Sequence, residues 1–337
     1  MAATAPFSNL KPMRVYRCFA AGLLLAALCA CAPAQKWRLI VTGDDRWNTN
    51  APRPGLDKDG VNVTGLAILN KAIIAEHPNL LLISGDTVGG AESDAEQTSQ
   101  FKTWMDVMKP VYDSDIKVLV VRGNHEMHCP HSSDIWRSVF SGKFQNPGGG
   151  PAGEEDMTFA LNYQNAVIIG FDQFFTEKPK VNQPWLDQVL AANKKPHIFL
   201  FAHKMAFEAG NHDDGMELDP AARDAFWNSI AKAGGRTYFC GHDHYYDHAS
   251  VTGANLPQDK AIHQFIVGTA GAPFVKGNKP INGNGSWTVN HLSHVENRLG
   301  YVVVDVDGDK ATLTFKGQDA SGAFVPMDTW SYTATHS

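Results

Sequence analysis

The amino-acid sequence predicts an α/β fold in which mixed β-sheets form the centre of one domain and helices pack outside them. Short, continuous apolar runs alternate with amphipathic helical stretches along most of the chain. No linker or internal repeat interrupts this alternation from Lys36 onward. Toward the C-terminus, hairpin signals replace the helical stretches. Together these observations favour one α/β domain rather than separate helical and β domains.

The apolar runs lack polar alternation, as strands buried on both faces do. They occupy residues 38–42, 80–84, 117–121, 166–171, 197–202 and 237–240. Between them, apolar residues recur at spacings near three and four, which predicts helices over residues 65–77, 100–112, 183–193 and 220–234. Residues 146–156 are expected to form a surface loop. Hairpin strands are expected over residues 261–269, 300–317 and the tail through Tyr332, with a turn at 307–310.

Composition excludes several classes of protein. The chain has 337 residues, 43% of them apolar, and is therefore long enough to bury a large core. Charged residues make up 19%, which argues against a disordered chain. The net charge of −6 argues against a protein that binds nucleic acid through phosphate contacts.

The N-terminus is typical of an export signal. Lys11, Arg14 and Arg17 precede a short apolar run that ends in small residues. We expect a signal over residues 1–31 and one domain over residues 32–337. Removing residues 1–30 takes away three cations and no anion, so the mature chain would carry a net charge of −9.

Two cleavage points are open. "LCAC" resembles a bacterial lipobox with Cys31 as the lipidated residue, and "APA" over residues 32–34 suits ordinary signal peptidase. The lipobox is the preferred interpretation. It predicts a periplasmic protein, lipid-anchored to the outer membrane of a Gram-negative bacterium, that touches the membrane only through this anchor. Cys129 and Cys240 would then remain, either as a disulfide or, as we expect, as free thiols.

Five predicted strands end in residues that bind metals, which is the main functional signal of the sequence. Glycine precedes four of these ends, and glycine lets backbone approach a bound ion closely. Because sites in α/β sheets form at the carboxyl ends of strands, these side chains are expected to converge. Carboxylate and imidazole together suit Zn, Mn or Fe. The residues are Asp44, Asp86, Asn124 with His125, His203, and His242 with His244.

The ordered motifs "GDD", "GD", "GNHE", "FAH" and "GHDH" resemble those of the calcineurin-like metallophosphoesterases, which include purple acid phosphatases, diesterases and nucleotidases. The resemblance covers about residues 36–317. It implies a β-sandwich of mixed sheets flanked by helices, and two divalent ions that generate hydroxide for attack on a phosphoester. His125 would face the substrate and protonate the leaving oxygen. The implied ligands are Asp44 and His244 for the first ion, Asp86 as the bridge, and Asn124, His203 and His242 for the second.

The first motif departs from the family pattern, which is Asp-x-His. Arg46 stands where the histidine is expected, and guanidinium has no lone pair to offer a metal. Purple acid phosphatases carry a tyrosine three residues after the second aspartate, and that position is Gly89 here. Water, Asp45 or a distant histidine would fill the vacant place. Arg46 itself either contacts a substrate phosphate or pairs with a nearby carboxylate.

The sequence therefore predicts an enzyme that hydrolyses small phosphoesters with two divalent metal ions, with monoesters preferred. Phosphodiesterase or nucleotidase activity of the same family is the alternative within this class. A non-catalytic metal-binding surface lipoprotein is the alternative outside it. His212, in the loop after His203, is a further candidate for contact with substrate or metal.

Overall fold

The computed structural model describes Met1 and residues 36–47, 59–277 and 285–335. The chain divides into two units, Met1–Ala34 and Gln35–Ser337, and every element discussed below lies in the second unit. The expected export signal, including Cys31, lies outside the described residues except for Met1. Within the described ranges, every helix is too short or too polar to span a lipid bilayer.

Two mixed sheets form the centre of the second unit. The first sheet has the strand order β13-β12-β11-β1-β2-β3, with β1, β2 and β3 parallel and β11 antiparallel to β1. Its strands are β1 (Lys36–Thr42), β2 (Leu80–Ile83), β3 (Lys117–Val120), β11 (Gly300–Asp307), β12 (Lys310–Gln318) and β13 (Phe324–Thr333).

The second sheet has the order β10-β8-β9-β7-β6-β5-β4, in which β5, β6, β7 and β9 are parallel. Strands β4, β8 and β10 pair antiparallel with their neighbours. The strands are β4 (Phe159–Tyr163), β5 (Ala166–Gly170), β6 (His197–Phe201), β7 (Thr237–Cys240), β8 (Tyr246–Gly253), β9 (Ile262–Val267) and β10 (Trp287–Val295).

The two sheets pack face to face and bury one core between them. Alternate residues of each strand point to opposite faces, so only every second residue enters this core. On β1, Leu39 and Val41 contribute to the core between the sheets, together with Phe199 and Phe201 of β6. Ile40 of β1 belongs instead to the core beneath the helices. Continuous apolar strands are thus explained by burial on both faces.

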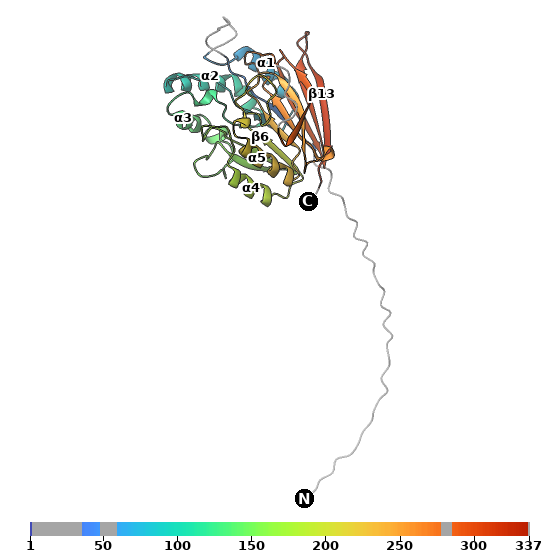
Figure 1. The fold of residues 1–337 in the computed structure, drawn as a ribbon. Helices are drawn as coiled ribbons and strands as arrows, with labels where there is room; N and C mark the ends of the chain where they lie inside the picture. Colours follow the sequence, from blue (N-terminus) through green and yellow to red (C-terminus); the bar gives the residue numbers. More distant parts are fainter. Residues whose placement is uncertain (2–35, 48–58, 278–284, 336–337) are drawn as a thin grey trace. The chain divides into compact units, whose positions relative to one another are not determined.

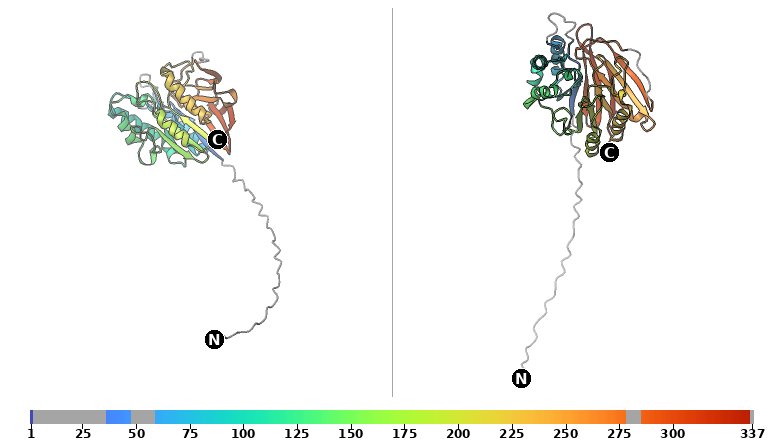
Figure 2. Two further views of the ribbon diagram at one scale, coloured as in Figure 1. Left: turned by 60° about the horizontal axis from the view of Figure 1, so that its bottom comes forward. Right: turned by 60° about the vertical axis from the view of Figure 1, so that its left-hand side comes forward.

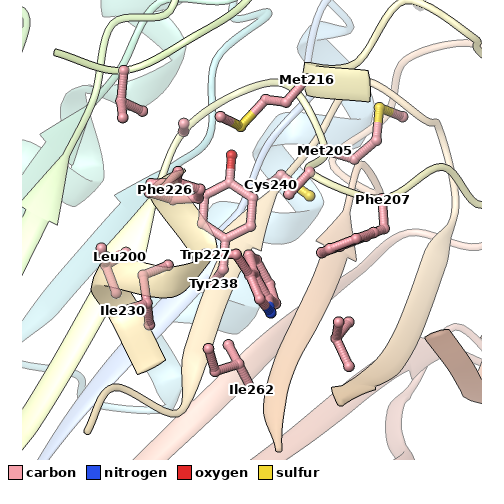
Figure 3. Close-up of a cluster of buried hydrophobic side chains, with 14 of the residues drawn as sticks. Leu200, Met205, Phe207, Met216, Phe226, Trp227, Ile230, Tyr238, Cys240 and Ile262 are labelled. Atoms are coloured by element: carbon pink, nitrogen blue, oxygen red, sulfur yellow. The ribbon is translucent and has the colours of Figure 1, made fainter. Parts of the chain in front are cut away.

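Helices cover the outer face of each sheet (Figures 1 and 2). Helices α1 (Val63–Ala75), α2 (Asp94–Tyr112) and α3 (Ser132–Val139) pack on the first sheet, and α4 (Gln183–Ala192) and α5 (Pro220–Lys232) on the second. Figure 3 shows the core between the second sheet and its helices, in which Phe226, Trp227 and Ile230 of α5 pack with Leu200 and Tyr238 of the sheet.

The predicted α/β class and the flanked β-sandwich are confirmed. The six predicted buried strands and four predicted helices are present, and α2 differs most from its prediction because it begins at Asp94 rather than at residue 100. Helix α3 and strands β4, β8 and β10 were not predicted, and neither were the short 3₁₀ helices of the described residues. Cys129 and Cys240 are both buried free thiols, as expected, so the possible disulfide between them is absent.

Candidate metal centre

The metal-ligating side chains follow the carboxyl ends of strands from both sheets. The strands β1, β2 and β3 of the first sheet lead to Asp44, Asp86 and Asn124, and β6 and β7 of the second lead to His203 and His242. The buried ligand residues form two groups, in each of which the ligand atoms all lie within 4.8 Å of one another, and Asp86 belongs to both. The groups are Asp86 with His203 and His242, and Asp44 with Asp86 and His244. The structure thus brings the predicted residues together, as a bridging role for Asp86 requires.

The backbone at these ligands is unusual. Asp44, Asp86 and His242 have φ angles of 62°, 53° and 71°, in the left-handed region that residues with a Cβ seldom adopt. Such conformations persist where the surrounding structure holds them, and they concentrate at functional sites. Here the chain turns sharply at the end of each strand, and the turn directs the side chain toward the neighbouring ligands.

Two glycines leave room for the carboxylates. A Cβ on Gly123 would lie 2.1 Å from Asp86 Oδ1, and a Cβ on Gly241 would lie 2.1 Å from Asp44 Oδ2. Both distances are far below van der Waals contact, so any other residue would displace a ligand. This explains why glycine precedes Asn124 and His242 in the motifs.

Buried Glu126 fixes the loops that carry Asp86 and Asn124. Its carboxylate accepts hydrogen bonds from the backbone N–H groups of Asp86 (3.1 Å), Thr87 (2.7 Å) and Gly123 (2.6 Å). Burial and the neighbouring Asp86 carboxylate raise the pKa of Glu126 to about 7. Glu126 is therefore a positioning residue, and the "GNHE" motif contains it although the sequence interpretation gave it no role.

The second group has the donor atoms that a divalent cation prefers. His203 Nδ1 lies 2.9 Å from the carbonyl oxygen of Ser84, which only accepts, so Nδ1 carries the proton and Nε2 presents a lone pair. That lone pair faces Asn124 Oδ1 at 3.0 Å and Asp86 Oδ1 at 3.3 Å. Burial lowers the pKa of His203 well below its usual value, which keeps the ring neutral. Three acceptors thus converge, and a divalent ion satisfies all three.

Arg46 lies against the first group, which consists of Asp44, Asp86 and His244. Its Nε donates to Asp86 Oδ2 at 3.0 Å, and its Nη2 lies 3.3 Å from His244 Nε2. His244 Nδ1 lies 2.8 Å from the carbonyl oxygen of Pro273, so the Nε2 lone pair accepts from Arg46. Arg46 therefore pairs with a carboxylate, which is one of its two expected roles, but the carboxylate is the predicted bridging ligand.

Asp45 does not fill the place that the missing histidine leaves. Its side chain is buried and its Oδ2 accepts a hydrogen bond from Trp104 Nε1 at 2.8 Å. The residue therefore packs toward α2 rather than into either ligand group. Gly89, where purple acid phosphatases carry tyrosine, has no room for a side chain, because a Cβ there would lie 2.5 Å from the carbonyl oxygen of Trp47.

His125 lies beside the ligand groups. Its Nδ1 is 2.6 Å from the carbonyl oxygen of Gly89 and therefore donates, while its Nε2 is 3.8 Å from Asp86 Oδ2. Its side chain is 20% exposed, so His125 lies at the edge of the buried ligand groups. Burial lowers the pKa of His125 below its ordinary value.

The loop after β6 adds Lys204 and Asp214, neither of which was given a role from the sequence. Lys204 Nζ is 2.7 Å from His242 Nε2 and donates to Asp214 Oδ2 at 2.6 Å. Asp214 Oδ1 is also 2.7 Å from His242 Nε2. Lys204 directly follows His203, which is the one signal in the sequence that could have indicated it.

Asp243 anchors this loop over the ligands. It accepts from His212 Nδ1 at 2.6 Å and from Asn211 Nδ2 at 3.2 Å, and the Tyr245 hydroxyl donates to its other oxygen. The ring centroid of His212 lies 4.0 Å from that of His242. His212 is thus beside a predicted ligand, and Asp243 holds it there.

A family model described as calcineurin-like phosphoesterase matches residues 65–246, more than half of the chain. The range contains Asp86, Asn124, His203, His242 and His244, whereas Asp44 and Arg46 precede it. No curated protein matches the sequence.

Several solved structures share the fold. A purple acid phosphatase from yellow lupin (Lupinus luteus) seeds has a TM-score of 0.62 at 14% identity, over 90% of this chain and 55% of that one. The chain thus spans about half the length of the lupin protein. GAP50, the anchor in the inner membrane complex of Plasmodium, has a TM-score of 0.59 at 11% identity, over 90% of this chain and 89% of that one. A dimetal phosphatase from Danio rerio has a TM-score of 0.55 at 13% identity, over 89% of this chain and 99% of that one.

Proposed function

The chain belongs to the calcineurin-like phosphoesterase family, and we propose that it is a metal-dependent hydrolase of small phosphoric monoesters. The observation that carries the proposal is the convergence of buried carboxylates and histidines on Asp86. Aspartate, asparagine and histidine donors favour Zn, Mn or Fe over Mg or Ca, which prefer oxygen alone. The ligands of this metal centre would be Asp44, Asp86, Asn124, His203, His242 and His244.

Bound divalent metal would polarise the phosphoryl group and supply a nucleophile at neutral pH. The chain itself supplies the proton for the leaving group. His125 keeps its Nδ1 proton on the Gly89 carbonyl, so the second proton of the charged ring sits on Nε2, the atom that faces the site. The negative charge of a bound phosphate favours this charged form and opposes the effect of burial.

Positive side chains beside the ligands support a preference for monoesters. Arg46, with 12% of its side chain exposed, contacts both Asp86 and His244. Lys204 lies against His242. A monoester carries one more ionisable oxygen than a diester, so fixed cations favour it more strongly.

The proposal is tested with p-nitrophenyl phosphate and bis(p-nitrophenyl) phosphate, using the purified protein with added Mn²⁺ or Zn²⁺. We expect metal-dependent hydrolysis of the monoester at the higher kcat/KM, abolished by a chelator. A faster reaction with the diester would transfer the proposal to the phosphodiesterase alternative. No hydrolysis of either ester by metal-loaded protein would favour the non-catalytic alternative, which the pairing of Arg46 with two predicted ligands also favours.

We further propose that the protein acts outside the cytoplasm as a lipoprotein anchored through Cys31. The basic residues, the short apolar run and the lipobox of the sequence support this proposal. An outer-membrane location in a Gram-negative cell follows from the same motif. His212 is proposed as a substrate-binding residue because its ring lies beside that of His242.

A further inference from the structure

The two ligand groups differ in what their acceptor atoms face. In the second group the His203 Nε2 lone pair faces two more acceptors, Asn124 Oδ1 and Asp86 Oδ1. In the first group, N–H donors already serve the acceptors, because Arg46 donates to Asp86 Oδ2 and to His244 Nε2. In the second group the described residues place Lys204 at His242 Nε2 but no side-chain cation among the three converging acceptors, whereas in the first group Arg46 bonds to two acceptors.

Arg46 is held in this place by its backbone. Its N–H donates to the carbonyl oxygen of Asp86 at 3.1 Å, and the residue forms a β-bridge with Val61. The following residue, Trp47, donates to the carbonyl oxygen of Gly60 at 2.8 Å. These bonds fix the backbone position from which the Arg46 side chain reaches Asp86 and His244.

The buried carboxylates around Arg46 also favour a guanidinium beside Asp86 and His244. Asp44 and Asp86 are both fully buried, and buried carboxylates need a positive partner. A guanidinium stays charged throughout the physiological pH range. A divalent ion added between the same acceptors would displace the two hydrogen bonds of Arg46 and would meet its charge at close range.

Lys204 is placed differently. Its Nζ bonds to Asp214 Oδ2 and His242 Nε2, whereas the converging acceptors of the second group are Asn124 Oδ1, Asp86 Oδ1 and His203 Nε2. Lys204 therefore bonds to one predicted ligand of the second group, His242 Nε2, which it would have to release to a bound ion, and it does not bond to the other three acceptors. The contrast with Arg46 assigns an ion to one group and a side-chain cation to the other.

We propose that the protein binds one divalent ion, on Asp86, Asn124, His203 and His242, and that the Arg46 guanidinium replaces the second ion beside Asp44, Asp86 and His244. This inference rests on the proposed function only for the presence of a metal centre. It replaces the family expectation of two ions with a centre of one metal and one fixed organic cation. In this centre the guanidinium supplies positive charge but no site for activating water.

The test is the metal content of the purified full chain after equilibration with saturating Mn²⁺ and removal of free ion. Mass spectrometry gives the Mn:protein ratio, and electron paramagnetic resonance distinguishes an isolated ion from a coupled pair. We expect about one isolated ion in the wild type. Arg46→His restores the ligand of the family motif and should bind about two coupled ions. Arg38→His is the matched control, since Arg38 on β1 pairs with Asp305 away from the site, and it should bind about one.

Two coupled ions in the wild type would overturn the inference, and so would a wild type that binds none. A folded Arg46→His variant that still binds one ion would show that Arg46 does not exclude the second. The wild-type ratio decides the count even if this variant does not fold. A wild type that binds one ion but hydrolyses no ester would refute the proposed function and leave this inference standing. Ester hydrolysis by a wild type that binds two ions would support the proposed function and refute the inference of one ion.

Discussion

His203 Nε2 and Asp86 Oδ1 lie 3.3 Å apart, with the lone pair of the imidazole facing the carboxylate. The two residues come from different sheets, β6 and β2, so this pair joins the two halves of the sandwich at the metal centre. Two such acceptors repel each other unless a cation lies between them. The pair therefore defines where metal binding should be most sensitive to substitution.

Asp86→Ala is expected to abolish metal binding. Asp86 is shared by both ligand groups, and changes in residues that only support a ligand already cost 10–100-fold in metal affinity. We expect Mn²⁺ affinity to fall by at least about a hundredfold, measured by equilibrium dialysis. Asp106→Ala, on the exposed face of α2, is the control and should bind like the wild type. Near-normal affinity in Asp86→Ala would remove Asp86 from the ligand set.

His125→Ala should separate proton transfer from metal binding. The side chain lies beside Asp86 without being one of its metal partners, so metal content should stay at the wild-type value. Turnover should fall by roughly a hundredfold or more, the usual size of a general-acid contribution. His131→Ala tests a histidine of the same loop whose side chain is 68% exposed, and it should leave kcat unchanged. If His125→Ala loses metal instead, His125 is a ligand.

Arg46→Ala should reduce kcat/KM by roughly tenfold or more. Loss of a charged hydrogen bond to the substrate phosphate would cost about 1.5–3 kcal/mol, and Arg46 stands at the site, with its Nε 3.0 Å from Asp86 Oδ2. The comparison is made at a Mn²⁺ concentration that loads only the tighter site, so that a second ion does not replace the lost charge. Equal kcat/KM for variant and wild type would limit Arg46 to a structural role.

His263→Gln should flatten the dependence of stability on pH. His263 Nδ1 lies 2.8 Å from Nε2 of His248, whose Nδ1 donates to the Asp328 carboxylate, and the His263 ring stacks on Trp330. Burial and the neighbouring His248 lower the pKa of His263 to about 2. Below a pH of about 6.5 the unfolded chain binds a proton that the folded protein does not, so stability falls as pH falls.

The expected contribution of His263 is about 1.4 kcal/mol per pH unit between pH 6 and 4. Urea unfolding of both proteins across this range measures it as the difference between the two slopes, which cancels the metal-site histidines common to both. Parallel curves would mean that His263 titrates in the folded protein.

Cys31→Ser should release the protein from the membrane fraction if Cys31 carries lipid. Fractionation and mass determination of the mature N-terminus check this. A wild-type N-terminus at Gln35 would instead establish ordinary secretion, because cleavage after "APA" removes Cys31 altogether.

Much of the fold was predictable because buried strands leave continuous apolar runs. Strands β1, β2, β3, β5, β6 and β7 were all found in this way. Strand β10 (Trp287–Val295) was missed because it is half exposed and carries His291 and His294, so its composition resembles a loop. Helix α3 was missed because it has only eight residues and follows a loop rich in histidine, cysteine and proline.

Residues of the metal centre were predictable where they belong to motifs at strand ends. The positions of Lys204 and Asp214 were not, because they depend on hydrogen bonds to His242 across a gap of 38 and 28 residues. Nor does any local pattern show that Arg46 reaches His244, 198 residues away. These contacts are set by tertiary packing, which periodicity does not encode.

Glu126 gives the metal centre a property beyond its hydrogen bonds. Because one buried carboxylate holds the backbone of both Asp86 and Gly123, the loops on either side of the bridging position are preorganised before an ion arrives. The conformational entropy of these loops is then lost during folding rather than on metal binding. The apo and metal-loaded proteins should therefore show the same slow amide hydrogen exchange at Asp86 and Gly123, and metal affinity should reflect ligand chemistry alone.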